Sequence, residues 1–203
     1  MLANGIAIYG GRHNAVTDNL IADPVREGSA LHAGYRHGST DFGGRLEFAR
    51  NTTVRAGTRE LNWNIGLGAI WFYVPEKPMD SEIHVTDSDF LDVTYNGIMF
   101  VAEWTVKDRY AITNVHVRDV RLDGVATNVI SARAAEWATF EDVDARNVGN
   151  RFDNNCGTFH FTGVSEFEIR RVGDSNDGGW YDWGAGCDDR PATVEPPEPS
   201  PWP

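Results

Sequence analysis

The sequence predicts an all-β protein, a right-handed single-stranded parallel β-helix of about six coils that lacks an N-terminal cap. A repeat, its internal periodicity and a column of small polar residues support this. The segment Ile112–Val120 returns as Phe140–Val148, 28 residues later. Such repeats are typical of solenoids, in which a unit buries its apolar face only against a stacked neighbour. Apolar and polar residues alternate within each copy, which indicates strands.

Small polar side chains recur once per predicted coil. They are Asn19, Asn51, Ser88, Asp119 and Asn147, and the residues before them are Asp18, Arg50, Asp87, Arg118 and Arg146. Amide and hydroxyl groups stacked in this way can hydrogen-bond along the coil axis, and Asn and Asp tolerate bends. We interpret the column as structural, so Asn51 in the sequon Asn51-Thr52-Thr53 is expected to be a poor glycosylation site.

An apolar column marks a second sheet. The strand-starting inward residues are Ile6, Leu31, Ile70, Ile98, Val129 and Phe159, followed by Ile8, Ala33, Phe72, Phe100, Ser131 and Phe161. The expected outward positions are Ala7, His32, Trp71, Met99, Ile130 and His160. The phrase Asn4-Gly5-Ile6 returns as Asn96-Gly97-Ile98, about three coils later. A one-residue slip would exchange the two faces.

Two regions follow from this pattern. Residues 1–181 are predicted to form the β-helix, with insertions at 34–45, 55–65, 74–82 and 102–110 that could build a binding face. Residues 182–203 are predicted to form a Gly/Pro-rich tail or linker. From Arg190 onward neither sheet nor helix is expected, because proline lacks the backbone donor.

The amino-acid composition excludes some classes of binding partner. The 203 residues carry a net charge of −12, which repels phosphate backbones and argues against nucleic acid. The same charge argues more weakly against a polyanionic substrate and leaves neutral glycans unaffected. No apolar run approaches transmembrane length and no signal peptide is recognisable, so we expect no membrane association. At full length a monomer is expected.

The chain has two cysteines, Cys156 and Cys187. In an oxidising compartment they could form one disulfide, worth about 3–4 kcal/mol by loop entropy. Two unpaired thiols in a cytosolic chain are equally compatible with the sequence.

No catalytic or metal residues follow from spacing alone. Glycoside hydrolysis needs two carboxyl groups across the scissile bond, but Asp18 and Asp87 have Arg50 between them and are interpreted as a solvated ladder. The run Asp174–Gly179 lacks the spacing of an EF-hand calcium loop. His32 and His160 lack a third zinc ligand, so we predict no metal and no cofactor.

Three aromatic residues are candidates for contact with sugar rings. Trp71, Tyr73 and Trp104 combine flat apolar faces with polar edges. Alternatively, they cover the outside of the sheet under a loop, and the sequence leaves both interpretations open.

The first hundred residues resemble glycoside hydrolase family 87, the bacterial α-1,3-glucanases and mycodextranases. The similar phrases are Asn4-Gly5-Ile6-Ala7-Ile8-Tyr9-Gly10-Gly11, Asn14-x-Val16-x-Asp18-Asn19, Leu31-His32, Arg50-Asn51-Thr52, Asn62-Trp63 and Gly68-Ala69-Ile70-Trp71-Phe72-Tyr73. The resemblance implies the C-terminal part of a secreted β-helix catalytic domain that hydrolyses α-1,3-glucan with inversion and without an organic cofactor. In that family an Asp-Asp-Gly motif just before the Asn4–Gly11 segment supplies catalytic carboxylates, so none is assigned to a residue of this chain.

The resulting hypothesis is a fragment of an extracellular glycoside hydrolase that contributes coils and part of the glycan cleft and is inactive alone. The expected substrate contacts are His32, Arg36, Trp71, Tyr73 and Trp104. One alternative is a β-helix that binds carbohydrate without cleaving it. The other is a polyuronate lyase, which needs calcium-bridging acids and which the net charge disfavours.

Overall fold

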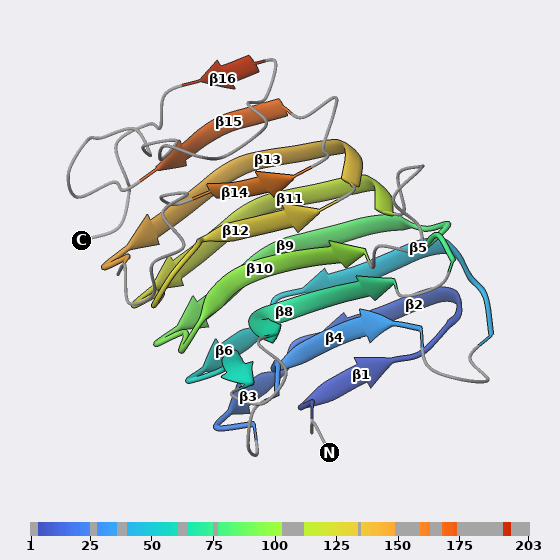
Figure 1. Cartoon of the computed structure of the whole chain (residues 1–203), viewed down its shortest axis with the longest axis horizontal. Coiled ribbons are helices and arrows are strands. Elements are labelled where there is room, and N and C mark those ends of the chain that lie inside the picture. The colour runs from blue at the N-terminus through green and yellow to red at the C-terminus, as the bar shows by residue number, and fades with distance from the viewer. Residues whose placement is uncertain are drawn as a thin grey trace.

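The computed structural model describes residues 4–24, 28–35, 40–60, 65–74, 77–102, 112–133, 135–148, 159–162, 168–173 and 193–195. Every regular element in these ranges is a β-strand. The strands form two layers, and the chain passes from one to the other and back as it advances (Figure 1). We call the layers sheet A and sheet B. No helix that could cross a membrane was found in the described ranges.

Sheet A contains one strand from each coil. Its parallel strands, in spatial order, are β1 (Ile6–Ile8), β4 (Leu31–Gly34), β8 (Ile65–Val74), β10 (Asn96–Ala102), β12 (Ile130–Arg133) and β14 (Phe159–Thr162). The short strand β7 (Thr58–Glu60) pairs antiparallel with β8. Six coils therefore pass through the described part of sheet A, as the sequence predicts.

Sheet B holds the longer strands. Its main path is β16 (Thr193–Glu195), β15 (Glu168–Gly173), β13 (Ala135–Arg146), β11 (Ile112–Asp123), β9 (Glu82–Leu91), β5 (Phe42–Ala49) and β2 (Gly11–Thr17). Off this path, β6 (Thr52–Val54) pairs with β9 and β3 (Leu20–Ala22) pairs with β6. Each strand pairs in parallel with the equivalent strand of the next coil. This is the predicted parallel β-helix class of fold.

Left-handed backbone recurs at two places, which we call bends, toward the ends of the sheet B strands, in addition to His13, Gly44, Asn114 and Trp137 nearer the strand starts. The first bend has left-handed backbone at Asp18, Arg50, Asp87, Asp119, Asp142 and Arg171. The second has it at Asp23, Arg55, Asp92, Gly124 and Asn147, five residues after the first. Asp, Asn and Gly adopt this conformation more readily than other residues, which explains their frequency at the bends.

The register corrects the predicted repeat. Ile112 on β11 lies opposite Ala135 on β13, a shift of 23 residues and not 28. The error equals the five-residue spacing between the bends, because the sequence match pairs the first bend of one coil (Asp119) with the second bend of the next (Asn147). Asp119 and Asn147 each follow an arginine, so the two local sequences are alike although their positions differ.

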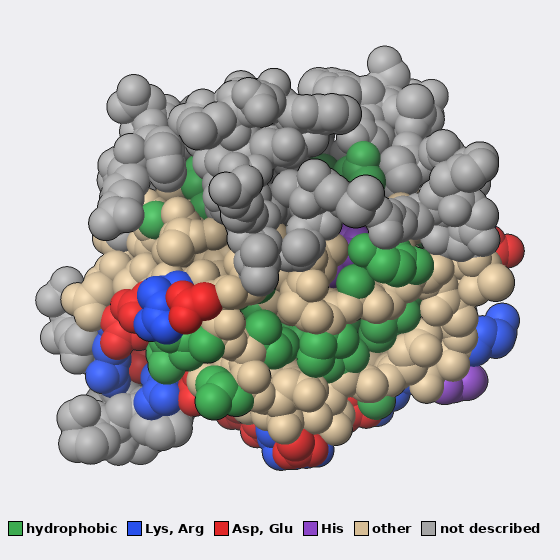
Figure 2. Space-filling view, turned by 90° about the horizontal axis from the view of Figure 1, so that it is seen from below, with side chains coloured by type: hydrophobic (Ala, Val, Ile, Leu, Met, Phe, Trp, Pro, Cys, Tyr) green, Lys and Arg blue, Asp and Glu red, His purple; other side chains and the backbone are tan. Residues whose placement is uncertain are grey.

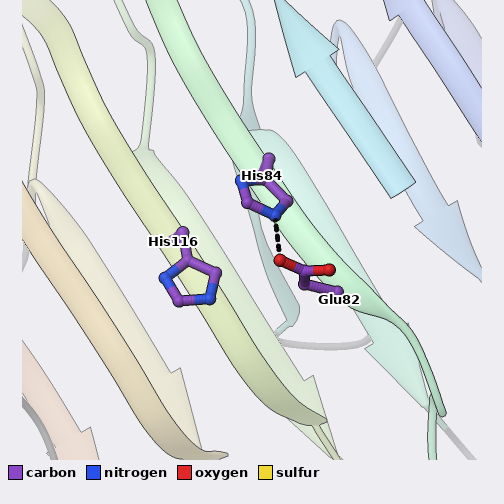
Figure 3. A group of neighbouring side chains, drawn as sticks. All are labelled: Glu82, His84 and His116. Atoms are coloured by element: carbon purple, nitrogen blue, oxygen red, sulfur yellow. Dashed lines mark hydrogen bonds and ion pairs between the residues drawn. The ribbon is translucent and has the colours of Figure 1, made fainter. Parts of the chain in front are cut away.

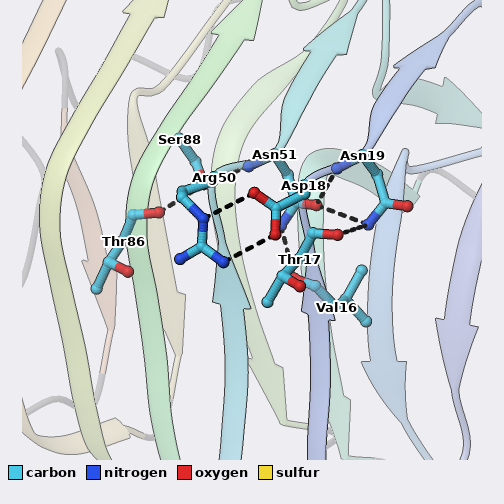
Figure 4. Close-up of polar contacts among 8 residues, drawn as sticks. All are labelled: Val16, Thr17, Asp18, Asn19, Arg50, Asn51, Thr86 and Ser88. Atoms are coloured by element: carbon cyan, nitrogen blue, oxygen red, sulfur yellow. Dashed lines mark hydrogen bonds and ion pairs between the residues drawn. The ribbon is translucent and has the colours of Figure 1, made fainter.

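The polar ladder is confirmed for its first three members (Figure 4). Asn19 donates to Asn51 Oδ1 from its backbone nitrogen at 3.2 Å and from Nδ2 at 2.9 Å. The Asn51 backbone nitrogen donates to Ser88 Oγ at 3.1 Å. Val120 lies opposite Ser88, so the predicted places of Asp119 and Asn147 in this column are wrong. Asn51 is buried, as its ladder role requires.

The sheet A register is confirmed except at one strand. Ile6, Leu31, Ile70 and Ile98 pair in succession, but Ile98 lies opposite Ile130, not Val129. The predicted inward Ser131 and outward Ile130 are therefore wrong: Ala132 pairs with Phe100 and Ser131 with Met99. The slip occurred because Val129 and Ile130 are adjacent, apolar and both fully buried, so composition does not distinguish them.

The repeated Asn-Gly-Ile phrase occupies equivalent places three coils apart. A Cβ on Gly5 would lie 2.6 Å from the Ala30 carbonyl oxygen, and one on Gly97 would lie 2.5 Å from the Val129 carbonyl oxygen. At both positions glycine lets the backbone of the next coil approach closely.

Phenylalanines from both sheets fill the space between the layers. Phe72 on β8 stacks on Phe100 on β10, with ring centroids 4.9 Å apart, and packs edge-on against Phe48 on β5 at 5.5 Å. At the end of the stack that carries β1 and β3, apolar side chains form a band beside adjoining acidic and basic groups (Figure 2). There Ile6 and Ile8 are only partly buried.

Ion pairs connect successive coils along the outside of sheet B. Arg50 donates two hydrogen bonds to Asp18, at 2.7 and 2.8 Å, and Arg55 makes the same paired contact with Asp23. The hydrogen bond from each arginine is the main cause that lowers the pKa of its aspartate. Asp18 is therefore held as an ion-paired carboxylate, as the solvated-ladder interpretation predicts.

Acid should remove the contribution of these pairs. A lowered folded-state pKa stabilises the protein above the unfolded-state pKa of about 3.9, and the contribution is lost as pH falls below that value through the folded-state pKa. We expect Asp18→Asn to reduce the dependence of stability on pH in this acid range. Urea unfolding at a series of pH values measures this. Arg50→Gln should give the same result, and an unchanged acid dependence in both variants would contradict the linkage.

One strand lies in the stretch predicted to form no sheet. β16, at Thr193–Glu195, pairs in parallel with β15. The expectation of no sheet after Arg190 is wrong at these residues, because the three of them contain no proline and keep their backbone donors. The division at residues 181 and 182 stays a prediction.

Candidate functional site

The two sheets differ in the chemistry they carry. The six parallel strands of sheet A contain no aspartate or glutamate. Sheet B carries inter-coil ion pairs between Arg50 and Asp18 and between Arg121 and Asp89. Sheet A is thus the part of the described chain that offers a largely uncharged outer surface.

Four rings form a row across the first three strands of sheet A. Tyr9 follows β1, His32 lies on β4, and Trp71 and Tyr73 lie on β8. Successive ring centroids are 5.5 Å apart for Tyr9 and His32, 4.6 Å for His32 and Trp71, and 4.9 Å for Trp71 and Tyr73. We call these four residues the aromatic row. The parallel register creates it, because His32 lies directly opposite Trp71.

The imidazole of His32 is held in a defined orientation. Its Nδ1 lies 3.0 Å from the backbone oxygen of Trp71. A carbonyl oxygen only accepts, so Nδ1 carries the hydrogen of this bond. Gly34 leaves space for the ring, since a Cβ at that position would lie 2.8 Å from His32 Cε1.

The four side chains of the aromatic row differ in their exposure to solvent. His32 is 3% exposed and Trp71 is 7% exposed. Tyr9 and Tyr73 are half-buried and keep accessible ring surface. The Trp71 indole Nε1 is buried and has no hydrogen-bond partner among the described residues. For Trp71 the covering interpretation therefore fits better than an open platform, whereas Tyr73 is accessible for contact.

A polar cluster adjoins the row. The Tyr35 backbone nitrogen donates to the Tyr73 backbone oxygen at 3.2 Å, and the Tyr35 hydroxyl donates to the Pro78 oxygen at 2.9 Å. Burial is the main cause that raises the Tyr35 pKa, so this phenol stays protonated at neutral pH. Lys77 Nζ lies 4.4 Å from the Tyr35 ring centroid and pairs with the exposed carboxylate of Asp41. Lys77 and Asp41 are therefore charged hydrogen-bonding groups close to the aromatic row.

The structure brings together three of the five predicted substrate contacts. His32, Trp71 and Tyr73 lie in one row, while Arg36 and Trp104 lie outside the described residues. Cys156 and Cys187 also lie outside them, so the disulfide stays a prediction.

Sequence reasoning missed Tyr9 and Tyr35. Their signal is positional: each comes directly after a strand of sheet A. It also predicted no metal site, whereas Glu82, His84 and His116 gather on sheet B.

Comparison with known proteins bears on this arrangement. A solved structure that matches is the catalytic unit of a thermostable GH87 α-1,3-glucanase from Streptomyces thermodiastaticus strain HF3-3, with a TM-score of 0.67 and 29% sequence identity over 89% of this chain. The chain is GH87-like. It spans 35% of the length of that glucanase chain. Searches of protein-family models and of curated proteins gave no match.

Proposed function

We propose that the GH87-like chain is part of an extracellular glycoside hydrolase that degrades α-1,3-glucan, and that sheet A supplies part of its glycan cleft. The observation that carries this is the aromatic row on a sheet whose parallel strands lack carboxylates. Aromatic faces pack on the apolar faces of sugar rings while their polar edges hydrogen-bond. The relationship to a GH87 α-1,3-glucanase supports the choice of glycan.

Within this proposal the row has divided roles. Tyr73 and Tyr9 contact the sugar rings, while His32 and Trp71 form the layer beneath and hold them in place. Arg36 and Trp104 extend the contact along the cleft. Lys77 and Asp41 hydrogen-bond to sugar hydroxyls at one end of the row.

Cleavage requires paired carboxyl groups, which the six parallel strands of sheet A do not carry. Inversion needs two carboxyl groups about 6.5–9.5 Å apart. We propose that the catalytic carboxylates lie outside this chain and that the chain alone does not cleave glucan. Release of reducing sugar from α-1,3-glucan by the pure 203-residue chain would contradict this.

A second candidate is a β-helix that binds glycan without cleaving it. The same lack of carboxylates on the six parallel strands of sheet A favours this candidate. Joining the chain to a segment with paired aspartates distinguishes the two. Turnover after joining supports the hydrolase, whereas retained binding without turnover supports the binding protein. A polyuronate lyase is less favoured, because it needs calcium-bridging acids beside the substrate.

We expect Tyr73→Ala to weaken binding to α-1,3-glucan by about fivefold. The lost ring contact is worth about 1 kcal/mol, and a tenfold change in affinity corresponds to about 1.4 kcal/mol. The measurement is depletion of the chain from solution by insoluble α-1,3-glucan over a range of glucan concentrations.

Trp137 on sheet B provides the matched control. Its side chain is aromatic and 54% exposed but lies on the other sheet. Trp137→Ala should bind glucan as the unaltered chain does. Loss of binding in Trp137→Ala together with full binding in Tyr73→Ala would place the glycan on the wrong sheet for this proposal.

A further inference from the structure

Two histidines and a glutamate meet on the outer face of sheet B (Figure 3). Glu82 and His84 lie two residues apart on β9, so their side chains point to the same side of the strand. His116 lies on β11, directly opposite His84 in the parallel register. The imidazole rings are stacked with centroids 4.9 Å apart. One potential ligand atom from each of the three residues lies within 4.8 Å of the others.

Hydrogen-bond partners hold one ring nitrogen of each histidine in a defined orientation. His84 Nε2 lies 2.7 Å from Glu82 Oε1, and His116 Nδ1 lies 2.9 Å from Thr139 Oγ1. The Thr139 contact leaves His116 Nε2 as its ligand atom and orients the ring, as outer-shell partners do for metal-bound histidines. The scaffold is two paired strands, so little conformational freedom remains to be lost on binding.

The side-chain types suit a cation. Imidazole nitrogens and carboxylate oxygens are among the groups that bind Zn²⁺ in proteins.

One positive charge opposes a bound cation. Arg45 lies opposite Glu82 on the neighbouring strand β5. Arg45 is itself paired with Glu47 at 3.6 Å and is half-exposed, so solvent and this carboxylate screen it. Glu47 lies opposite His84 and adds negative charge at the rim of the cluster.

We propose that Glu82, His84 and His116 bind one Zn²⁺ ion on the outer face of sheet B. Two imidazole nitrogens and one carboxylate oxygen form a three-ligand set that zinc accepts, with a fourth position open to water. When the ion binds, neutral His84 takes the tautomer with its hydrogen on Nδ1, and Nε2 becomes the ligand atom. The bound ion joins successive coils, because His84 and His116 belong to neighbouring coils.

The ligand types select the metal. Imidazole suits zinc and other late transition metals, whereas calcium takes six to eight oxygen ligands. Ca²⁺ should therefore not displace Zn²⁺ from this cluster.

Calorimetric titration of the full chain with ZnCl₂ tests the site. We expect saturable binding of one ion per chain, reversed by EDTA and unaffected by Ca²⁺. His84→Gln, His116→Gln and Glu82→Gln should each weaken binding about a hundredfold or more, and Thr139→Val about tenfold. Zinc should also raise the melting temperature of the unaltered chain but not that of His84→Gln.

His13 provides the matched control, since it is an exposed histidine on β2, two strands away from β9. His13→Asn, which keeps a residue tolerant of its left-handed backbone, should bind zinc normally. Circular dichroism without metal identifies any variant that does not fold, and Glu82→Gln changes only an exposed side chain.

Two results would overturn the proposal: no saturable zinc binding by the unaltered chain, or binding that persists in folded His84→Gln and Glu82→Gln. Because the cluster lies on sheet B, this test is independent of glucan binding at sheet A.

Discussion

Alanine in place of Phe72 is expected to lower the free energy of unfolding by about 3–5 kcal/mol. Phe72 is fully buried and contacts both layers, since its ring stacks on Phe100 from sheet A and packs edge-on against Phe48 from sheet B. Truncation removes the buried ring and leaves a cavity that the surrounding β-structure fills only partly. The two aromatic pairs add about 0.5–1.5 kcal/mol each beyond the buried area.

Urea unfolding followed by far-UV circular dichroism measures this loss. Phe72→Leu keeps an apolar side chain at the position and should lose clearly less stability than Phe72→Ala. Trp137→Ala removes an exposed ring and should change stability little. A loss below about 1 kcal/mol in Phe72→Ala would mean that this ring does not join the two layers.

Asn51→Ala is expected to cost roughly 2–4 kcal/mol. Asn51 is 1% exposed, and its amide satisfies three groups in the neighbouring coil: its Nδ2 donates to the Val16 oxygen at 2.8 Å, and its Oδ1 accepts from the Asn19 backbone and side chain. Alanine leaves the oxygen of the buried Val16 without this partner, while the half-buried Asn19 side chain keeps its bond to the Thr17 oxygen at 2.8 Å. The loss is large because unpaired buried polar groups keep their full desolvation cost.

Asn19→Ala is the control for this prediction. Asn19 stands at the end of the same ladder and is only half-buried, so water can replace its contacts. We expect its substitution to cost well under half of the Asn51→Ala effect, measured by the same urea unfolding. Equal losses in the two variants would contradict the buried-ladder explanation.

The sequence predicted the class of fold and most of one sheet's register. Two patterns were sufficient for this. Alternation at period two marks the inward-facing positions, because these accept mainly apolar residues. The Asn-Gly-Ile phrase marks a close backbone approach, because only glycine fits there. The predicted register failed at Val129, where two adjacent apolar residues are both buried. The repeat length failed because two bends in each coil carry similar residues, so Asp119 resembles Asn147 without being equivalent to it.

The sites were less predictable than the fold because they depend on coil length. His32 meets Trp71 across 39 residues, whereas His84 meets His116 across a coil of a different length. A local pattern fixes which face a histidine takes but not which residue of the next coil lies opposite it. His32, Trp71 and Tyr73 could be predicted because the sheet A register was correct there; the cluster on sheet B required the structure.

Hydrogen–deuterium exchange of the full chain, with and without a soluble α-1,3-gluco-oligosaccharide, tests the central claim most directly. If sheet A is the glycan face, the oligosaccharide should slow exchange in peptides that contain β4 and β8 and leave those from β9 and β11 unchanged. Slowed exchange in β9 and β11 alone, or no change anywhere at saturating oligosaccharide, would contradict the account.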